Sequence, residues 1–221
     1  MFDATGGPVL GIDPGLSRCG YGAVRSDGQR LVPVAYGVLR TPAAAPLPER
    51  LAMLRQELDD LLDELRPGAL AVERILFQVN ARTAIAVGQA SGLALAAAAH
   101  RRVPVTHYSP NEVKLAVAGY GGADKAQVQA MVTRLCNLDA PPSPPDAADA
   151  LALAICHLWA APLQARARSA AGAPPDAGGS RFERAVAAAL TRDASGSTRG
   201  AAAAGTRSAA AARGAAKRDA T

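Results

Sequence analysis

Four acidic side chains at the ends of apolar segments are the residues of this chain best suited to chemistry. The first is Asp13, which ends the apolar run Val9-Leu10-Gly11-Ile12. Pro14 has no N–H to extend a β-ladder and Gly15 permits a sharp turn, so the run predicts a buried strand that stops at Asp13. A carboxylate at the end of a buried strand needs a cation, a proton or a metal as its partner. A turn aspartate that only caps its own loop is the alternative.

Glu73 repeats this pattern, because it ends the apolar run Ala69-Leu70-Ala71-Val72. Asp146 and Asp149 come much later, three residues apart on the first turn of a predicted helix, where both carboxylates face the same way. Helix capping and the helix dipole account for many such aspartates. The segment behind them, Ala150–Ile155, is apolar nearly all round. It predicts a buried helix, which places the acid pair in a crevice or against another element.

A cluster of all four acids would have a defined chemistry. Carboxylates brought within about 5 Å of one another repel strongly unless hard cations lie between them. Carboxylates with Mg²⁺ are how a two-metal phosphodiesterase activates water and stabilises the leaving 3′ oxygen, with the ions about 4 Å apart. Together the four acids therefore favour metal-assisted phosphodiester hydrolysis.

The elements that must position these acids follow from hydrophobic spacing. Leucines at intervals of three and four residues in 46–66 predict an amphipathic helix, which Pro67-Gly68 ends. Three strands precede this helix, and alternating strands and helices follow it. This order predicts an α/β fold whose mixed sheet joins an antiparallel meander to two parallel strands, with helices on both faces. The predicted strands are 9–13, 20–25, 31–39, 69–73 and 103–108, and the predicted helices are 46–66, 80–101, 110–118, 124–137 and 146–161.

The composition changes sharply near residue 162. Residues 162–221 carry ten Lys/Arg against four Asp/Glu, whereas residues 1–161 carry fourteen against fifteen. The later segment has too little aliphatic bulk to offset its ordering entropy. We therefore expect a nuclease domain at 1–161 and a disordered, basic Ala/Arg/Gly-rich tail at 162–221. Such a tail could hold nucleic acid by counterion release, or it could be neutral drift in composition.

The cysteines, the apolar runs and the motifs that are absent from the sequence disfavour a disulfide-bonded protein, a membrane protein and an NTP-driven motor. Cys19, Cys136 and Cys156 lie far apart without a Cys-x-x-Cys pair, which predicts reduced, buried thiols in a cytoplasmic protein. The run Gly92–Ala99 is too short to span a bilayer, so we expect no membrane partner. The phosphate-binding pattern Gly-x-x-x-x-Gly-Lys-Ser/Thr is absent from the sequence, which disfavours an NTP-driven motor.

A series of motifs resembles the RuvC family of crossover junction endodeoxyribonucleases, whose fold is ribonuclease-H-like. The motifs occur in the family's order and at compatible spacing, over about residues 8–160 and not in the tail. They are Gly11-Ile12-Asp13-Pro14-Gly15 with Gly20-Tyr21-Gly22, Ala71-Val72-Glu73-Arg74, Asn80, Gly88-Gln89-Ala90 with Gly92, Val113-Lys114, Lys125-Ala126-Gln127-Val128, and Asp146-Ala147-Ala148-Asp149-Ala150-Leu151-Ala152.

The resemblance implies Mg²⁺-dependent cleavage of four-way (Holliday) DNA junctions by a homodimer, in recombination and DNA repair. Each subunit would nick one of two strands of like polarity and leave 5′-phosphate ends. The resemblance also implies two Mg²⁺ ions per site, with Mn²⁺ as an alternative, and the RuvA–RuvB branch-migration complex as a partner. The acids that it makes catalytic and metal-binding are Asp13, shared by both ions, and Glu73, Asp146 and Asp149.

Four basic residues become candidates for DNA contact through the same resemblance. Lys114 and Lys125 fall at the family's basic positions near the scissile phosphate, although a lone surface lysine is more often simply solvated. Lys125 also lies on the first turn of a predicted helix, whose N–H groups favour an anion. Arg74 and Arg82 are expected to touch phosphates.

The loop that follows Glu73 should overhang the site. Phe77 in this loop could stack on an unpaired base at the junction centre, or it could belong to the core. The family commonly has an aromatic residue at the position of Leu76, where this chain departs from the pattern. The side chain that acts as the junction wedge is therefore one of these two.

Two other classes of function compete with a junction nuclease. A structure-specific DNA-binding protein without catalysis would not need to keep four packed charges. A sugar or acetate kinase of related fold also binds phosphate at an Asp-x-Gly turn, but this chain is too short for the two-domain clamp of those enzymes.

Overall fold

The computed structural model describes residues 7–28, 30–74 and 81–170, without the side chains of 81–83 and 163–170. The fold from the first strand into the last helix falls within one compact unit, residues 1–167. Its single described sheet has five strands in the order β3-β2-β1-β4-β5. They are β1 (Val9–Asp13), β2 (Arg18–Asp27), β3 (Arg30–Arg40), β4 (Ala69–Glu73) and β5 (Val105–Tyr108).

The sheet has the mixed topology that the order of elements predicts. β1, β2 and β3 form an antiparallel meander, and β4 and β5 run parallel to β1. β2 begins at Arg18, two residues earlier than expected, because its pairing with β3 extends to that residue. β3 is an edge strand and carries Pro33, a residue that sheets tolerate mainly at edges.

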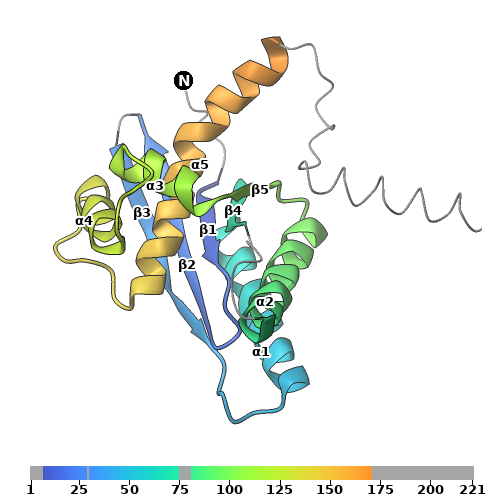
Figure 1. The fold of residues 1–221 in the computed structure, drawn as a ribbon. Helices are drawn as coiled ribbons and strands as arrows, with labels where there is room; N and C mark the ends of the chain where they lie inside the picture. Colours follow the sequence, from blue (N-terminus) through green and yellow to red (C-terminus); the bar gives the residue numbers. More distant parts are fainter. Residues whose placement is uncertain (1–6, 29, 75–80, 171–221) are drawn as a thin grey trace, which may run out of the picture. The chain divides into compact units, whose positions relative to one another are not determined.

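Helices cover both faces of the sheet, as predicted (Figure 1). Side chains of β1 and β4 point alternately to the two faces of the sheet. Leu10 and Val72 pack with α1 and α2 on one face, and Val9 and Ala71 pack with α3, α4 and α5 on the other. The helices are α1 (Leu47–Leu65), α2 (Ala81–His100), α3 (Pro110–Ala118), α4 (Lys125–Leu135) and α5 (Pro145–Ala170). α5 continues nine residues beyond its expected end at Ala161, with Pro162 inside it.

Two glycines allow α5 to lie directly on the sheet. Gly11 of β1 and Gly22 of β2 are cross-strand partners. A Cβ atom at Gly11 would lie 1.9 Å from the carbonyl oxygen of Ala150, and one at Gly22 would lie 2.6 Å from the backbone nitrogen of Leu151. Any side chain at either position would therefore lift α5 off the strands, so the glycines set the height of this helix above the sheet.

The cysteines are buried free thiols, as predicted: Cys19, Cys136 and Cys156. Burial raises the pKa of each thiol, so all three are held in their protonated form at neutral pH. Among the described helices, none is long and apolar enough to span a membrane.

Candidate active site

Asp13 and Glu73 lie at the carboxyl ends of neighbouring parallel strands. The register pairs Ile12 of β1 with Val72 of β4, so the next residue of each strand is one of these two acids. Asp13 lies two residues after Gly11, and Glu73 lies two residues after Ala71; Gly11 and Ala71 both face α5. Because strand side chains alternate, the two carboxylates share the face of the sheet that α5 covers.

The first turn of α5 lies against the same end of the sheet. Asp13 pairs with Gly20 of β2, and a Cβ atom at Gly20 would lie 2.2 Å from the carbonyl oxygen of Asp146. A residue with a side chain could not stand there without moving the helix. Gly20 therefore brings the backbone of Asp146 next to Asp13, and Asp149 follows one turn along the same helix.

The pKa values show that these four acids share one electrostatic environment. Burial raises the pKa of Asp13 to about 7, with further upward contributions from the charges of Glu73, Asp149 and Asp146. Burial also raises the pKa of Glu73, and the charge of Asp149 adds to the effect. Like charges destabilise each other's ionised forms in a poorly solvated site. The fold has therefore collected negative charge that favours a bound cation.

Lys125 supplies one positive charge to this cluster. Its Nζ atom donates a hydrogen bond of 2.6 Å to Asp149, and that bond is the main reason that its pKa is raised. Lys125 is the first residue of α4, whose start is fixed by a capping box between Asp124 and Gln127. The lysine is thus held beside the acids by a well-defined helix terminus.

Arg18 supplies a second positive charge, and it is not among the site residues that the sequence predicts. Its guanidinium group donates to the Asp146 carboxylate and forms an ion pair with it. A signal was present in the sequence: Arg18 lies two residues before Gly20, and therefore on the same face of β2. Sequence alone gave no reason to place this face against Asp146, 128 positions away.

The carboxylates do not close around a metal site in this structure. Among the residues that it describes, no three His, Cys, Asp or Glu side chains are arranged to hold a metal ion. Asp146 forms an ion pair with Arg18, and Asp149 forms one with Lys125. The donor set nevertheless fits a hard divalent ion, because it consists of carboxylate oxygens. The raised pKa of Asp13 shows that the nearby positive charge does not offset its burial and its acidic neighbours, so a bound cation would stabilise its ionised form.

The remaining candidates for DNA contact are less closely tied to the acids. Arg74 is exposed and donates through Nη2 to the carbonyl oxygen of His107 at 3.4 Å. Lys114 is half-buried on α3 and forms no hydrogen bond or ion pair with the acids in the described structure. Leu76 and Phe77 lie outside the described residues, and Arg82 lies in α2 with its side chain outside the description.

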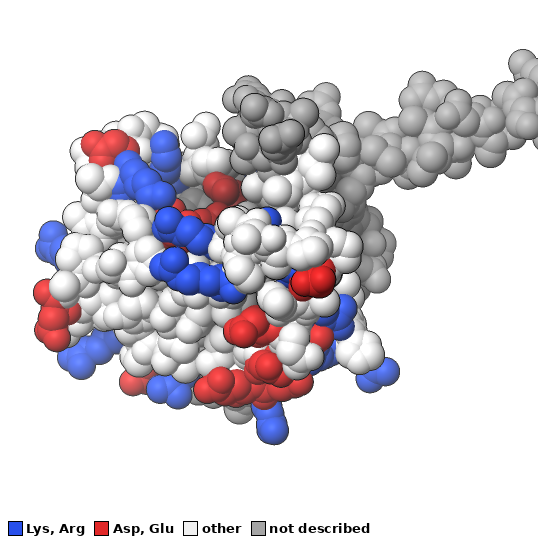
Figure 2. Space-filling view, turned by 90° about the horizontal axis from the view of Figure 1, so that it is seen from below, with Lys and Arg blue, Asp and Glu red and all other residues white. Residues whose placement is uncertain are grey.

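The molecular surface agrees with this assembly of charges. In the space-filling view, acidic side chains are set in a hollow that Lys and Arg side chains border (Figure 2). The Lys and Arg side chains lie along part of the rim, and positive charge there suits a polyanion that must approach the acids through its phosphates.

Comparisons with known proteins point to one family. The family model described as crossover junction endodeoxyribonuclease RuvC matches residues 9–157. The crossover junction endodeoxyribonuclease RuvC of Streptomyces avermitilis is 56% identical over 163 residues, which cover 73% of this chain and 93% of the relative. The solved Thermus thermophilus RuvC is 36% identical, with a TM-score of 0.67 over 71% of this chain and 96% of its own. The T. thermophilus RuvC in complex with Holliday junction substrate, also 36% identical, gives a TM-score of 0.68 over 72% of this chain and 96% of its own.

Proposed function

This chain belongs to the RuvC family of crossover junction endodeoxyribonucleases, and from that premise we propose that the four carboxylates beside the start of α5 form its catalytic centre. The protein is an endonuclease of DNA recombination and repair, and its proposed substrate is the four-way (Holliday) junction, as in the complex of its T. thermophilus relative. The proposed catalytic acids are Asp13, Glu73, Asp146 and Asp149.

One observation carries this proposal. Gly20, the cross-strand partner of Asp13, contacts the backbone of Asp146, and Glu73 ends the neighbouring strand in register with Asp13. Burial and the charges of the other three acids accordingly raise the pKa of Asp13 to about 7. These side chains come from two strand ends and a helix that are far apart in the sequence, so only the fold could bring them together. Clustered like charges are unfavourable for stability, which supports a role in function rather than in folding.

The nuclease chemistry of the RuvC family depends on divalent metal ions. We infer that the ion is Mg²⁺, bound as a pair, with Mn²⁺ able to replace it. When bound, such ions lower the pKa of an attacking water and neutralise the leaving 3′ oxygen. β1, which ends at Asp13, lies between β4, which ends at Glu73, and β2, whose Gly20 contacts the start of α5. Asp13 would therefore serve both ions, while Glu73 and the pair Asp146 and Asp149 would each help to hold one.

The DNA backbone would meet the cationic residues around the acids. Lys125 stands beside Asp149 at the N-terminus of α4, where both its ammonium group and the helix N–H groups favour a phosphate. Lys114, Arg74 and Arg82 are proposed as further phosphate contacts. The junction wedge is proposed to be Leu76 or Phe77.

Paired nicks need two catalytic centres, and we propose that a homodimer supplies them. The small-residue face of α2, with Gly88 and Gly92, leaves room for close helix approach, because a Cβ atom at either glycine would meet nothing within 4 Å. Light scattering at micromolar concentration should give the mass of a dimer, and the mass of a monomer would count against the proposal. The RuvA–RuvB complex is proposed as a further partner.

The proposed domain division is a nuclease domain at 1–161 and a basic tail at 162–221, with α5 continuing across that boundary to Ala170. The family match, which ends at residue 157, supports the first part. Limited proteolysis followed by mass spectrometry should remove the tail and leave a resistant fragment that ends in α5. Rapid cleavage inside the sheet-forming region would contradict the division.

Replacing each acid by its neutral isostere tests the catalytic centre. Asp13→Asn, Glu73→Gln, Asp146→Asn and Asp149→Asn should each abolish cleavage of a labelled four-way junction in Mg²⁺ while junction binding persists. Linear duplex should remain uncut by the wild type, and ATP should have no effect. Cleavage by any of these variants at a near wild-type rate would remove that acid from the catalytic centre.

A further inference from the structure

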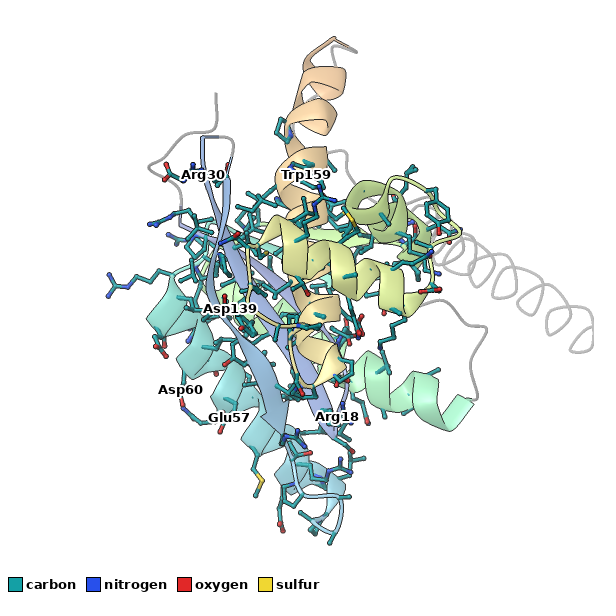
Figure 3. All side chains as sticks on the ribbon, turned by 90° about the vertical axis from the view of Figure 1, so that its left-hand side faces the viewer. Arg18, Arg30, Glu57, Asp60, Asp139 and Trp159 are labelled. Atoms are coloured by element: carbon teal, nitrogen blue, oxygen red, sulfur yellow. The ribbon has the colours of Figure 1, made fainter. Side chains whose placement is uncertain are left out.

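Asp146 is a proposed metal ligand, and in this structure its carboxylate forms an ion pair with Arg18. Arg18 stands at the beginning of β2, directly after the turn that follows Asp13. In Figure 3 it lies at the same end of α5 as the helix's first turn, whereas Trp159 lies towards the other end. The pair therefore belongs to the acidic end of the sheet.

Backbone packing fixes the position of Arg18 independently of its side-chain conformation. A Cβ atom at Gly15 would lie 2.2 Å from the carbonyl oxygen of Arg18, so the turn after Asp13 folds tightly onto this residue. Gly20, two residues on along the same face of β2, is in equally close contact with the backbone of Asp146. Arg18 is thus held between the end of β1 and the start of α5.

The charges of this region imply a competition for Asp146. A carboxylate that accepts hydrogen bonds from a guanidinium group has part of its oxygen lone pairs engaged, and these are the lone pairs that a hard cation needs. Arg18 and a metal ion at Asp146 would also repel each other. The side chain of Arg18 is 47% exposed, so it can turn away into solvent without breaking any part of the core.

We propose that Arg18 is a positioning residue that neutralises Asp146 until a divalent ion takes its place, and that then presents its guanidinium group to a phosphate of the DNA. This inference rests on the proposed function, because it assumes metal binding at Asp146. An arginine suits both states, since its charge is permanent and its planar fork matches a carboxylate and a phosphate equally well. Arg18 would thereby couple metal binding to DNA binding.

A calcium titration of the full-length protein tests the competition. Ca²⁺ takes the same oxygen ligands, and calorimetry measures its binding without relying on activity. Arg18→Gln should bind Ca²⁺ about two- to fivefold more tightly than the wild type, as expected from the loss of a partly exposed ion pair. Arg40→Gln is the matched control: Arg40 is the exposed cross-strand partner of Arg18, and its loss removes the same charge from the same end of the sheet.

Junction binding tests the second part of the proposal. Arg18→Gln should weaken binding of a four-way junction in Ca²⁺, where the arginine is released, by a larger factor than in EDTA, where Asp146 holds it. Gel analysis should verify that the junction stays uncut, and Arg18→Lys should restore part of the affinity. If Arg18→Gln weakened junction binding by the same factor in Ca²⁺ and in EDTA, the role of Arg18 in phosphate binding would be overturned.

The calcium data also separate this inference from the proposed function. If Arg18→Gln binds Ca²⁺ as weakly as Arg40→Gln, the competition is overturned. If Asp146→Asn binds Ca²⁺ as tightly as the wild type, Asp146 is not a metal ligand, and the proposed catalytic centre fails first. Tighter binding by Arg18→Gln together with weaker binding by Asp146→Asn supports both.

Discussion

Asp13→Asn should make the metal-free protein more stable at neutral pH while it abolishes cleavage. The pKa of Asp13 rises from 3.8 to about 7 on folding, mainly through burial and then through the charge of Glu73 and the acids of α5. Between these two values the folded protein keeps a proton that the unfolded chain has released. The contribution of this group to stability is therefore intact below about pH 4 and is lost as the pH rises to about 7.

The size of the effect follows from the same two pKa values. From pH 5 to pH 7 the wild type loses about 1.4 kcal/mol per pH unit through Asp13, which gives about 2–3 kcal/mol. An asparagine at this position does not titrate, so its advantage over the wild type should grow by this amount between pH 5 and pH 8. For a protein of this size the corresponding change in melting temperature is about 5–10 °C.

Urea unfolding in EDTA at pH 5 and pH 8 measures this difference directly. Asp139→Asn is the control, because Asp139 is an exposed carboxylate in the segment before α5 and should show the same stability difference from wild type at both pH values. A stability difference between Asp13→Asn and wild type that stays constant from pH 5 to pH 8 would refute the reasoning. It would mean that the acids do not share a poorly solvated site.

Three further outcomes test the arrangement around this acid. Gly20→Ala should destabilise the fold by about 1–3 kcal/mol and impair cleavage, because the added Cβ atom would meet the Asp146 carbonyl oxygen. Gly121→Ala is the control and should do neither, since its Cβ atom would meet nothing closer than 3.9 Å. Equal unfolding curves for the two variants would contradict this reasoning. Lys125→Gln should raise the pKa of Asp13 above about 7, since the lysine charge lowers it; carboxyl NMR measures the shift, and a lower pKa would show that another charge controls the site. Chelation with EDTA should stop junction cleavage in gel assays and excess Mg²⁺ should restore it; cleavage that persists in EDTA would exclude a metal-dependent reaction.

Much of the fold followed from the local pattern of the chain. The apolar runs that end at Asp13 and Glu73 predicted strands that stop there, and both strands stop at those residues. The leucines of 46–66 predicted the helix that became α1. These features depend on residues close together in the sequence, whose periodicity carries the information. The end of α5 was less predictable, because a proline usually ends or kinks a helix, yet α5 continues past Pro162 to Ala170.

The sequence by itself determined which carboxylates stand at the ends of buried elements, and the family resemblance ordered them into one site. Only the tertiary structure decided how each is partnered: Asp146 by Arg18 and Asp149 by Lys125. Those contacts join residues 128 and 24 positions apart and depend on strand register and on helix height above the sheet. No local pattern encodes such a contact, because it exists only where close backbone packing at residues such as Gly20 leaves two distant side chains within reach of each other.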